Sequence, residues 1–381
     1  MPRSCSLGRL ALLLSATTTL LGVNGQTSTF PATPLASKHF AYPTGIPYQV
    51  DTEPYLIRGG QTGYNQCNST TEGSGSLCQT SFLSALDDFC LWAPRNPNSL
   101  IADTEGEEVA WCTKPGHGTR LIPPGALQGV QFMKTPDYVQ VVGFIDQTKI
   151  NLQADDSGGE LDPHGADLRG NPLGSLVYST AWGNGTEYTQ VIEWHNFMGG
   201  SQFCFKACDP SKPNAAHYCE HVYDRIGQRS FDDGCRCAYN APNNAQNGTF
   251  ESCLGENQDF PGVYTTDGQV MTYKQPPESL GPISSLPYTA RVPASSSCTQ
   301  YTSAQLFSAL GAVSSTASAS ATTTGGGSGG STGGGAAQTG SQTKSGASAG
   351  ASATGTGGAE ALSASLVSGL LGVAFAAVFL A

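Results

Sequence analysis

The chain has 381 residues, a formal net charge of −11 at neutral pH and only 12% charged side chains. An acidic chain without a cluster of basic residues does not favour nucleic acid as a partner. Residues 55–300 have the composition of a single globular, disulfide-rich domain without an internal linker, although two smaller domains also fit this length.

The N-terminus predicts a secretory signal peptide over residues 1–25. Arg3 and Arg9 flank the start of an apolar run at residues 10–21, and Val23 and Gly25 stand where small residues precede a cleavage point. The apolar run is too short to span a bilayer. Residues 26–54 are rich in Thr, Pro and Tyr and are expected to run extended before the globular domain.

The C-terminal part predicts a stalk at residues 301–358 and a removable tail at residues 359–381. Residues 314–358 are almost wholly Ser, Thr, Gly and Ala, a composition that stays disordered and favours O-glycosylation in a secreted chain. After Glu360 the chain is apolar to its end, which is typical of a signal for a glycosylphosphatidylinositol (GPI) anchor. Attachment is expected between Gly350 and Gly355, and the alternative is a C-terminal transmembrane helix. Removing both ends changes the net charge from −11 to −12.

Three glycosylation sequons, at Asn68, Asn184 and Asn247, fit a secreted glycoprotein and mark exposed loops. Together with the two ends, they predict an extracellular protein that is GPI-anchored at the outer face of the plasma membrane or held in the cell wall. The expected partners are cell-wall glycans, and the membrane through the lipid of the anchor.

Disulfide bonds are expected because a secreted chain folds in an oxidising compartment. Of the 12 cysteines, Cys5 leaves with the signal peptide, and the odd one among the rest is expected to be Cys235, in the polar stretch 228–236. The ten candidates for disulfides are Cys67, Cys78, Cys90, Cys112, Cys204, Cys208, Cys219, Cys237, Cys253 and Cys298.

The residue pattern predicts a mainly β fold, a disulfide-braced sandwich or open barrel with one or two short helices. Residues 138–145 are apolar on both faces and are therefore expected to form a central strand. One helix is expected just before Pro94, because the apolar residues there follow helical spacing. Its apolar positions are Phe82, Leu83, Leu86, Phe89 and Cys90.

Further strands are expected on either side of glycine-rich turns. Residues 187–198 and 202–207 flank Gly199-Gly200, which predicts a hairpin with a two-residue turn. Other strands are expected at residues 108–113, 176–181 and 270–274.

An acidic loop after the central strand supplies the candidate binding site. Its glycines and Pro163 argue against regular structure, and its carboxylates repel one another unless a cation or a hydrogen-bond network holds them. A calcium ion and a network of turn hydrogen bonds are the two alternatives. The loop carboxylates are Asp155, Asp156, Glu160, Asp162 and Asp167.

Glu193 and His195 are two residues apart on one expected strand, so both are expected to point to the same face. They form either an acid–base pair or a polar pair that binds the acidic loop. The candidate binding residues are therefore Asp162, His164, Asp167, Glu193 and His195.

Residues 217–221 read His-Tyr-Cys-Glu-His, the inverted zinc-peptidase pattern in which two histidines bind zinc and the glutamate activates water. Cys219 lies inside the pattern and no third ligand is evident, which favours a structural helix between half-cystines. The sequence therefore assigns no cofactor, metal or catalytic residue, and a metal-dependent hydrolase is the weakest of the hypotheses.

Several long motifs resemble the fungal macrophage-activating glycoprotein family, which includes the immunoreactive mannoproteins of yeast-like basidiomycetes. The resemblance covers roughly residues 40–298 and rests on six motifs. They are Asp-Phe-Cys-Leu-Trp-Ala-Pro at 88–94, Asp-Thr-Glu-Gly-Glu-Glu-Val-Ala-Trp-Cys-Thr-Lys-Pro-Gly-His-Gly-Thr-Arg at 103–120, Thr-Pro-Asp-Tyr-Val-Gln-Val at 135–141, Gly-Glu-Leu-Asp-Pro-His-Gly-Ala-Asp at 159–167, Glu-Trp-His-Asn-Phe-Met at 193–198 and Tyr-Cys-Glu-His-Val-Tyr-Asp-Arg at 218–225.

The resemblance implies a heavily mannosylated, GPI-anchored surface protein that host immune receptors recognise through its glycans, and it implies no catalytic residue. Residues 228–236 depart from the family, whose members run from Arg-Ile-Gly directly into Cys-Ala-Tyr-Asn-Ala-Pro. This insert is either a genuine loop or a mis-spliced segment, and it supplies Cys235.

The sequence thus favours a structural or interaction role over catalysis. The alternative is a protein that binds or acts on cell-wall polysaccharide through the acidic loop with Glu193 and His195.

Overall fold

The computed structural model describes residues 30–226, 235–281, 283 and 285–308. The predicted signal peptide, most of the stalk and of the insert at 228–236, and the C-terminal tail lie outside the described residues.

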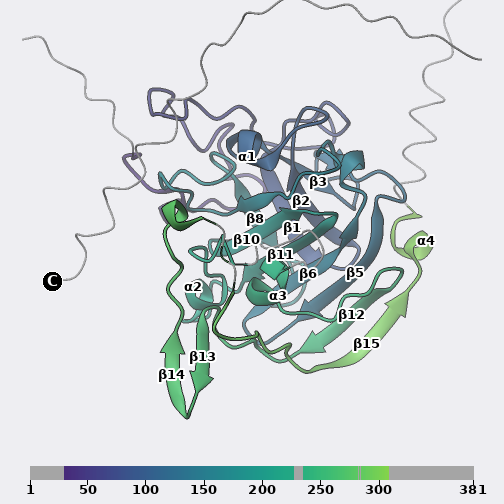
Figure 1. The fold of residues 1–381 in the computed structure, drawn as a ribbon. Helices are drawn as coiled ribbons and strands as arrows, with labels where there is room; N and C mark the ends of the chain where they lie inside the picture. Colours follow the sequence, from purple (N-terminus) through teal and green to yellow (C-terminus); the bar gives the residue numbers. More distant parts are fainter. Residues whose placement is uncertain (1–29, 227–234, 282, 284, 309–381) are drawn as a thin grey trace, which may run out of the picture. The chain divides into compact units, whose positions relative to one another are not determined.

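Two β-sheets pack into a sandwich around one hydrophobic core (Figure 1), which confirms the predicted mainly β, disulfide-braced fold. The six-stranded sheet consists, in spatial order, of β4 (Arg120–Leu121), β3 (Val109–Cys112), β2 (Asp88–Ala93), β1 (Thr80–Ala85), β8 (Leu176–Ser179) and β9 (Thr189–Val191). The seven-stranded sheet consists of β15 (Ser295–Tyr301), β12 (Phe250–Gly255), β5 (Leu127–Lys134), β6 (Tyr138–Ile145), β11 (Gln202–Cys208), β10 (Trp194–Gly199) and β7 (Gly159–Leu161). A separate hairpin joins β13 (Val263–Thr266) to β14 (Gln269–Thr272) and projects from the sandwich.

The helices are all short. The α-helices are α1 (Ile101–Thr104), α2 (Ala215–Tyr218), α3 (Cys235–Asn240) and α4 (Ser303–Leu306), and the 3-10 helices are η1 (Leu35–Ser37), η2 (Glu105–Glu107), η3 (Gln147–Ile150) and η4 (Glu278–Leu280). Among the described residues, none of them has the length and apolar character needed to cross a bilayer.

Aromatic side chains from the two sheets meet in the core. The rings of Trp92 and Trp194 lie 6.0 Å apart, and those of Phe89 and Phe203 also lie 6.0 Å apart. The side chain of Asn196 accepts a buried hydrogen bond from the backbone of Trp92 at 2.9 Å, so the sheets are joined by a polar contact as well. Burial of such large rings supplies much of the favourable free energy of folding.

The expected central strand is confirmed, because β6 lies between β5 and β11 in the middle of the seven-stranded sheet. Seven of its eight residues are buried, as its apolar residues on both faces predict.

The expected helix before Pro94 is wrong. This segment forms a hairpin of β1 and β2, in which Leu83 lies opposite Phe89 and the chain turns at Leu86 and Asp87. Both strands are buried on both faces, so their apolar side chains occupy adjacent as well as alternate positions, and helical spacing arises among them by coincidence. Periodicity alone does not separate the two structures in such short runs.

The single strand expected at residues 187–198 is split between the two sheets. β9 ends at Val191 and pairs with β8, whereas β10 begins at Trp194 and pairs with β11 and β7. Ile192 and Glu193 make the bend where the chain crosses between the sheets, so Glu193 is not part of a strand.

The expected hairpin between residues 187–198 and 202–207 is present, but its turn is one residue later. The turn residues are Gly200 and Ser201, with φ of 61° and 60°, as a type I′ turn requires. Gly199 stays in the strand opposite Gln202. A Cβ on Gly199 would lie 2.4 Å from backbone atoms of Gly158, so this glycine permits a close approach between two segments of the chain.

Five disulfides brace the sandwich, and they join the ten cysteines taken as candidates. The pairs are Cys67–Cys78, Cys90–Cys112, Cys204–Cys237, Cys208–Cys219 and Cys253–Cys298. Cys235 begins α3, but its side chain is outside the described part, so its free thiol stays a prediction.

The acidic loop is more ordered and more buried than its composition predicts. Residues 159–161 form β7, which pairs with β10 at the edge of the seven-stranded sheet, so the expectation of no regular structure is wrong. The side chains of Asp156, Asp162 and Asp167 are largely buried. Strand pairing and buried ionic contacts, neither visible in the local sequence, hold this loop against the sandwich.

The N-terminal segment also belongs to the packed body. Leu35, Ile46 and Val50 are buried in the main core, and the ring of Tyr42 lies 5.4 Å from that of Phe82 in β1. Residues 30–54 contain no strand, but they cover the core rather than lead into it.

Candidate functional site

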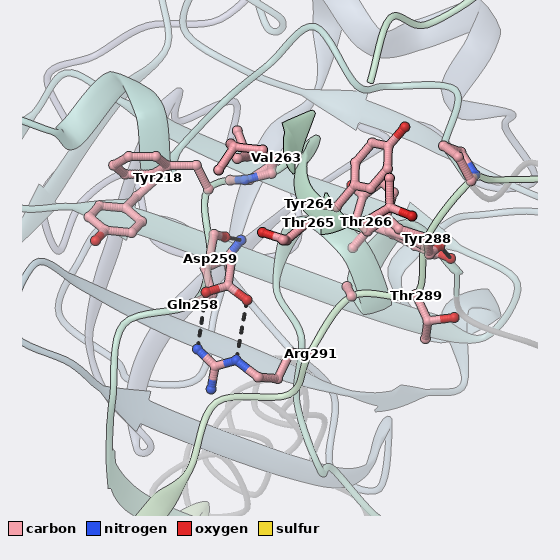
Figure 2. Close-up of a pocket in the computed structure, with 16 residues that line it drawn as sticks. Tyr218, Gln258, Asp259, Val263, Tyr264, Thr265, Thr266, Tyr288, Thr289 and Arg291 are labelled. Atoms are coloured by element: carbon pink, nitrogen blue, oxygen red, sulfur yellow. Dashed lines mark hydrogen bonds and ion pairs between the residues drawn. The ribbon is translucent and has the colours of Figure 1, made fainter. Parts of the chain in front are cut away.

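An aromatic groove lies beside the β13–β14 hairpin and encloses about 690 Å³. Five half-buried rings line it, together with hydroxyl and amide groups (Figure 2). The rings are those of Tyr218, Tyr239, Phe260, Tyr264 and Tyr288.

Separate segments supply the rings of the aromatic groove. Tyr264 on β13 and Tyr288 stack with centroids 4.8 Å apart and an interplanar angle of 1°. Tyr239 in α3 meets Tyr288 edge-on at 5.3 Å and donates its hydroxyl hydrogen to the Tyr288 carbonyl. Phe260 packs against Tyr218 of α2 at 4.7 Å. These mutual contacts fix the ring orientations before any ligand arrives.

The charged groups of the groove are paired with each other. Arg291 donates two hydrogen bonds to Asp259, each 3.2 Å long (Figure 2). The Tyr288 hydroxyl accepts from the backbone N–H of Gly262, and burial raises the pKa of Tyr288 to about 12, so it is neutral at physiological pH. The groove therefore presents neutral rings and hydroxyls with one internally compensated ion pair.

This arrangement suits a neutral, hydroxyl-rich ligand. The C–H face of a pyranose ring packs on an aromatic face, while its hydroxyls exchange hydrogen bonds with tyrosine, threonine and amide groups. Thr265, Thr266 and Thr289 line the same groove and supply such groups.

A second cluster lies in and beside the acidic loop, where two of the predicted site residues meet. The Nε2 atom of His164 lies 3.0 Å from the Oε2 atom of Glu193. The imidazole of His221 stacks on that of His164, with centroids 3.8 Å apart and an interplanar angle of 11°. We call His164, Glu193 and His221 the histidine cluster.

The two histidines of this cluster have opposite pKa shifts. Burial disfavours the charged form of His164, but the hydrogen bond to Glu193 and nearby carboxylate charges outweigh it and raise the pKa of His164. Burial and the charge of His164 lower the pKa of His221. Two stacked imidazoles cannot both be charged at low cost, so protonation of His164 disfavours protonation of His221.

Of the other three predicted site residues, Asp162 and Asp167 have hydrogen-bond partners of their own and line a cavity that His221 also lines, whereas His195 lies apart. The Oδ1 atom of Asp162 accepts from the backbone N–H groups of His164 and Gly165 at 2.7 and 2.8 Å, as in an Asx turn. Asp167 pairs with the guanidinium of Arg58. Turn hydrogen bonds and arginine thus hold Asp162 and Asp167. In the described part of the chain, the five loop carboxylates do not converge as a calcium site would require.

His195 is fully buried and does not lie on the surface with Glu193. Burial, followed by the charge of the neighbouring Lys206, lowers the pKa of His195 well below its usual value. The expectation that Glu193 and His195 share one face rested on a continuous strand, and the bend at residues 192–193 removes that relationship.

The inverted zinc-peptidase pattern at residues 217–221 does not form a helical metal site. α2 ends at Tyr218, and Cys219 is bonded to Cys208. The ring of His217 packs near Phe260, whereas His221 joins the histidine cluster. The two histidines of the pattern therefore serve different parts of the molecule.

The local sequence indicates neither the aromatic groove nor the role of His221. The tyrosines of the groove are spread over residues 218–288, and their only local signal is a stretch rich in Tyr, Thr and Pro at residues 260–289. The local pattern pairs His221 only with His217, because the true neighbours of His221 are 57 and 28 residues away along the chain, at His164 and Glu193.

The three sequon asparagines are exposed. The Oδ1 atoms of Asn68 and Asn184 accept hydrogen bonds from the hydroxyl groups of their sequon threonines, Thr70 and Thr186, at 2.6 and 2.8 Å. Their exposure leaves all three accessible for glycan attachment.

Two curated proteins of Mycosarcoma maydis are similar to this chain. Appressorium protein ROW2 is 42% identical over 227 residues, which are 58% of this chain and 72% of ROW2. Appressorium protein ROW1 is 45% identical over 207 residues, which are 54% of this chain and 46% of ROW1, so the match spans less than half of ROW1. No family model and no solved structure matches the chain. On the identity and coverage shared with ROW2, the chain belongs to the same protein family as ROW2.

Proposed function

We propose that this chain is a secreted glycoprotein of the fungal cell surface and that its folded body binds a neutral wall glycan in the aromatic groove. The single observation that carries glycan binding is the set of half-buried, pre-oriented rings with one compensated ion pair. The role is structural or adhesive, and no catalytic step is assigned to any residue.

Secretion is supported by several features of the chain. Five disulfides are typical of proteins that fold outside the reducing cytosol, and three exposed sequons are positioned for glycosylation. The expected signal peptide and the resemblance to surface mannoproteins are consistent with this location. In this proposal, mannose-rich glycans on the body and stalk are the groups that host immune receptors recognise.

Glycan binding is tested by replacing Tyr264 with alanine. Tyr264 stacks on Tyr288 in the groove, so its loss removes one aromatic face without touching the main core. We expect the full secreted chain to be retained by insoluble β-1,3-glucan, and the affinity of Tyr264→Ala to fall by about tenfold, the equivalent of about 1.4 kcal/mol. Depletion of protein from solution over increasing amounts of glucan measures the affinity.

The matched control is Tyr55→Ala, which removes a tyrosine that is 64% exposed and lies outside the groove. This variant is expected to bind as the unchanged chain does. Equal losses in the two variants, or no retention of the unchanged chain on β-1,3-glucan or chitin, would contradict the proposed role of the groove.

Anchoring through a GPI lipid is the second part of the proposal. The motivating pattern is the stalk of small residues followed by an apolar tail without basic residues. Treatment of intact cells with a phospholipase C specific for phosphatidylinositol is expected to release the protein into the medium. Protein that leaves the membrane only with detergent would favour the transmembrane alternative.

A further inference from the structure

The histidine cluster has the donor set of a transition-metal site. Its three ligand atoms, two imidazole nitrogens and one carboxylate oxygen, all lie within 4.8 Å of one another. Two imidazoles with a carboxylate suit zinc, copper and similar divalent ions, whereas calcium and magnesium prefer sites built from oxygen alone. The cluster lies outside the aromatic groove, so it is separate from the proposed glycan site.

The three residues come from separate segments that are fixed to the same framework. His164 follows β7, and its backbone N–H is held by Asp162. The carbonyl of Glu193 accepts from the backbone N–H of Cys208 at 3.0 Å. The side chain of Cys208 is bonded to Cys219, two residues before His221. Glu193 and His221 are therefore both tied to the end of β11, which limits their freedom to separate.

One imidazole nitrogen of the cluster lacks a partner. The Nδ1 atom of His221 is shielded from solvent and has no hydrogen-bond partner among the described residues. An unpaired buried polar atom costs about 1–3 kcal/mol, a cost that a bound ion or hydrogen-bonding ligand removes. The Nε2 atom of His164 and the Oε2 atom of Glu193 are already paired at 3.0 Å. The cluster therefore contains an unsatisfied nitrogen of His221 beside a paired imidazole and carboxylate.

The position next to His221 is open and acidic. His221 lines a cavity of about 630 Å³, and the other lining groups include the carboxylates of Glu105, Glu160, Asp162, Asp167 and Asp224 and the guanidinium groups of Arg58 and Arg225. Carboxylates outnumber the cations, which favours entry of a positive ion. An ion held by three protein ligands at this position would keep its remaining coordination site towards the cavity.

We propose that His164, Glu193 and His221 bind one divalent transition-metal ion, zinc or copper, with its remaining coordination position open to the acidic cavity. Tetrahedral ligands at zinc lie about 3.4 Å apart, as bond lengths of about 2.0–2.1 Å require. Ligand atoms that are up to 4.8 Å apart must therefore approach by up to about 1.4 Å, and the stacked imidazoles must rotate so that one nitrogen lone pair of each points at the ion.

Calorimetric titration of the full secreted chain, without an affinity tag and after treatment with chelator, tests the proposal. Zinc chloride and copper chloride are the probes, and calcium chloride is the control ion. We expect one equivalent of zinc or copper to bind with a dissociation constant below about 1 µM and calcium not to bind at this affinity. Binding is also expected to raise the thermal midpoint of unfolding, because the ion bridges three segments of the native state.

The variants His164→Ala and His221→Ala are expected to bind the metal at least about 100-fold more weakly. The matched control is His217→Ala, which removes the other histidine of the same local pattern, exposed and on α2. This control is expected to bind as tightly as the unchanged chain, and circular dichroism verifies that all variants are folded.

Substoichiometric binding by the unchanged chain, equal affinity in His221→Ala, or equal weakening in His217→Ala would each overturn the proposal. Glucan retention of His221→Ala separates this proposal from the proposed function, since that variant is expected to keep its affinity for glucan.

Discussion

Replacing Arg169 with alanine is expected to lower the free energy of unfolding by about 3–5 kcal/mol. The side chain of Arg169 is 0% exposed, and its Nε–H donates to Asp51 at 2.7 Å. The guanidinium also donates to the backbone carbonyl groups of Glu53 and Gly59. Truncation leaves the carboxylate of Asp51, which is 4% exposed, without its cation. Urea unfolding followed by tryptophan fluorescence measures the change.

The matched control is Arg291→Ala, which breaks a surface pair. Arg291 is 52% exposed and Asp259 is 59% exposed, so solvent screens the pair and its loss is expected to cost less than about 1 kcal/mol. If Arg169→Ala proved no more destabilising than this control, water would have to reach Asp51 in the variant. The conclusion that Arg169 fixes the N-terminal segment to the acidic loop would then be wrong.

Replacing Cys90 and Cys112 together with alanine is expected to lower the free energy of unfolding by about 3 kcal/mol or more. The disulfide joins residues separated by 22 positions and restricts the unfolded chain accordingly. Cys90 on β2 and Cys112 on β3 lie opposite each other in the core, and both are 0% exposed. Their loss therefore also leaves unfilled space, which adds to the cost. Urea unfolding under non-reducing conditions measures it.

The double variant of Cys253 and Cys298 distinguishes the two causes. This bond closes a longer segment, of 45 positions, but Cys298 is exposed on β15. If restriction of the unfolded chain were the only cause, removing the Cys253–Cys298 bond would lower the free energy of unfolding more than removing the Cys90–Cys112 bond. If burial also contributes, removing the Cys90–Cys112 bond would lower it at least as much. A clearly larger loss in the Cys253 and Cys298 variant would refute the role assigned to burial.

The local sequence predicted those features that depend on local chemistry. Alternating and doubly apolar runs gave the strands at residues 138–145 and 202–207, and glycines gave the hairpin between β10 and β11. Cysteines in a chain expected to be secreted gave the disulfide candidates. These features can be recognised from the sequence because each depends on a residue and its near neighbours along the chain.

The pairing of strands required the tertiary structure. Leu83 and Phe89 fit a helix and a hairpin equally well, and only burial on both faces by the surrounding sheets selects the hairpin. The bend at residues 192–193 likewise follows from the packing of two sheets, since a strand can join only one sheet at a time.

By itself, the sequence determined a β-rich, disulfide-braced chain with an acidic loop, and it singled out His164 and Glu193 as candidates. Only the tertiary structure decided that His221 joins them, that His195 is excluded from solvent and that distant tyrosines form one groove. The physical reason is that side-chain contacts between remote segments depend on how the sheets pack. The sequence shows which chemical groups are available, and the fold determines which of them come into contact.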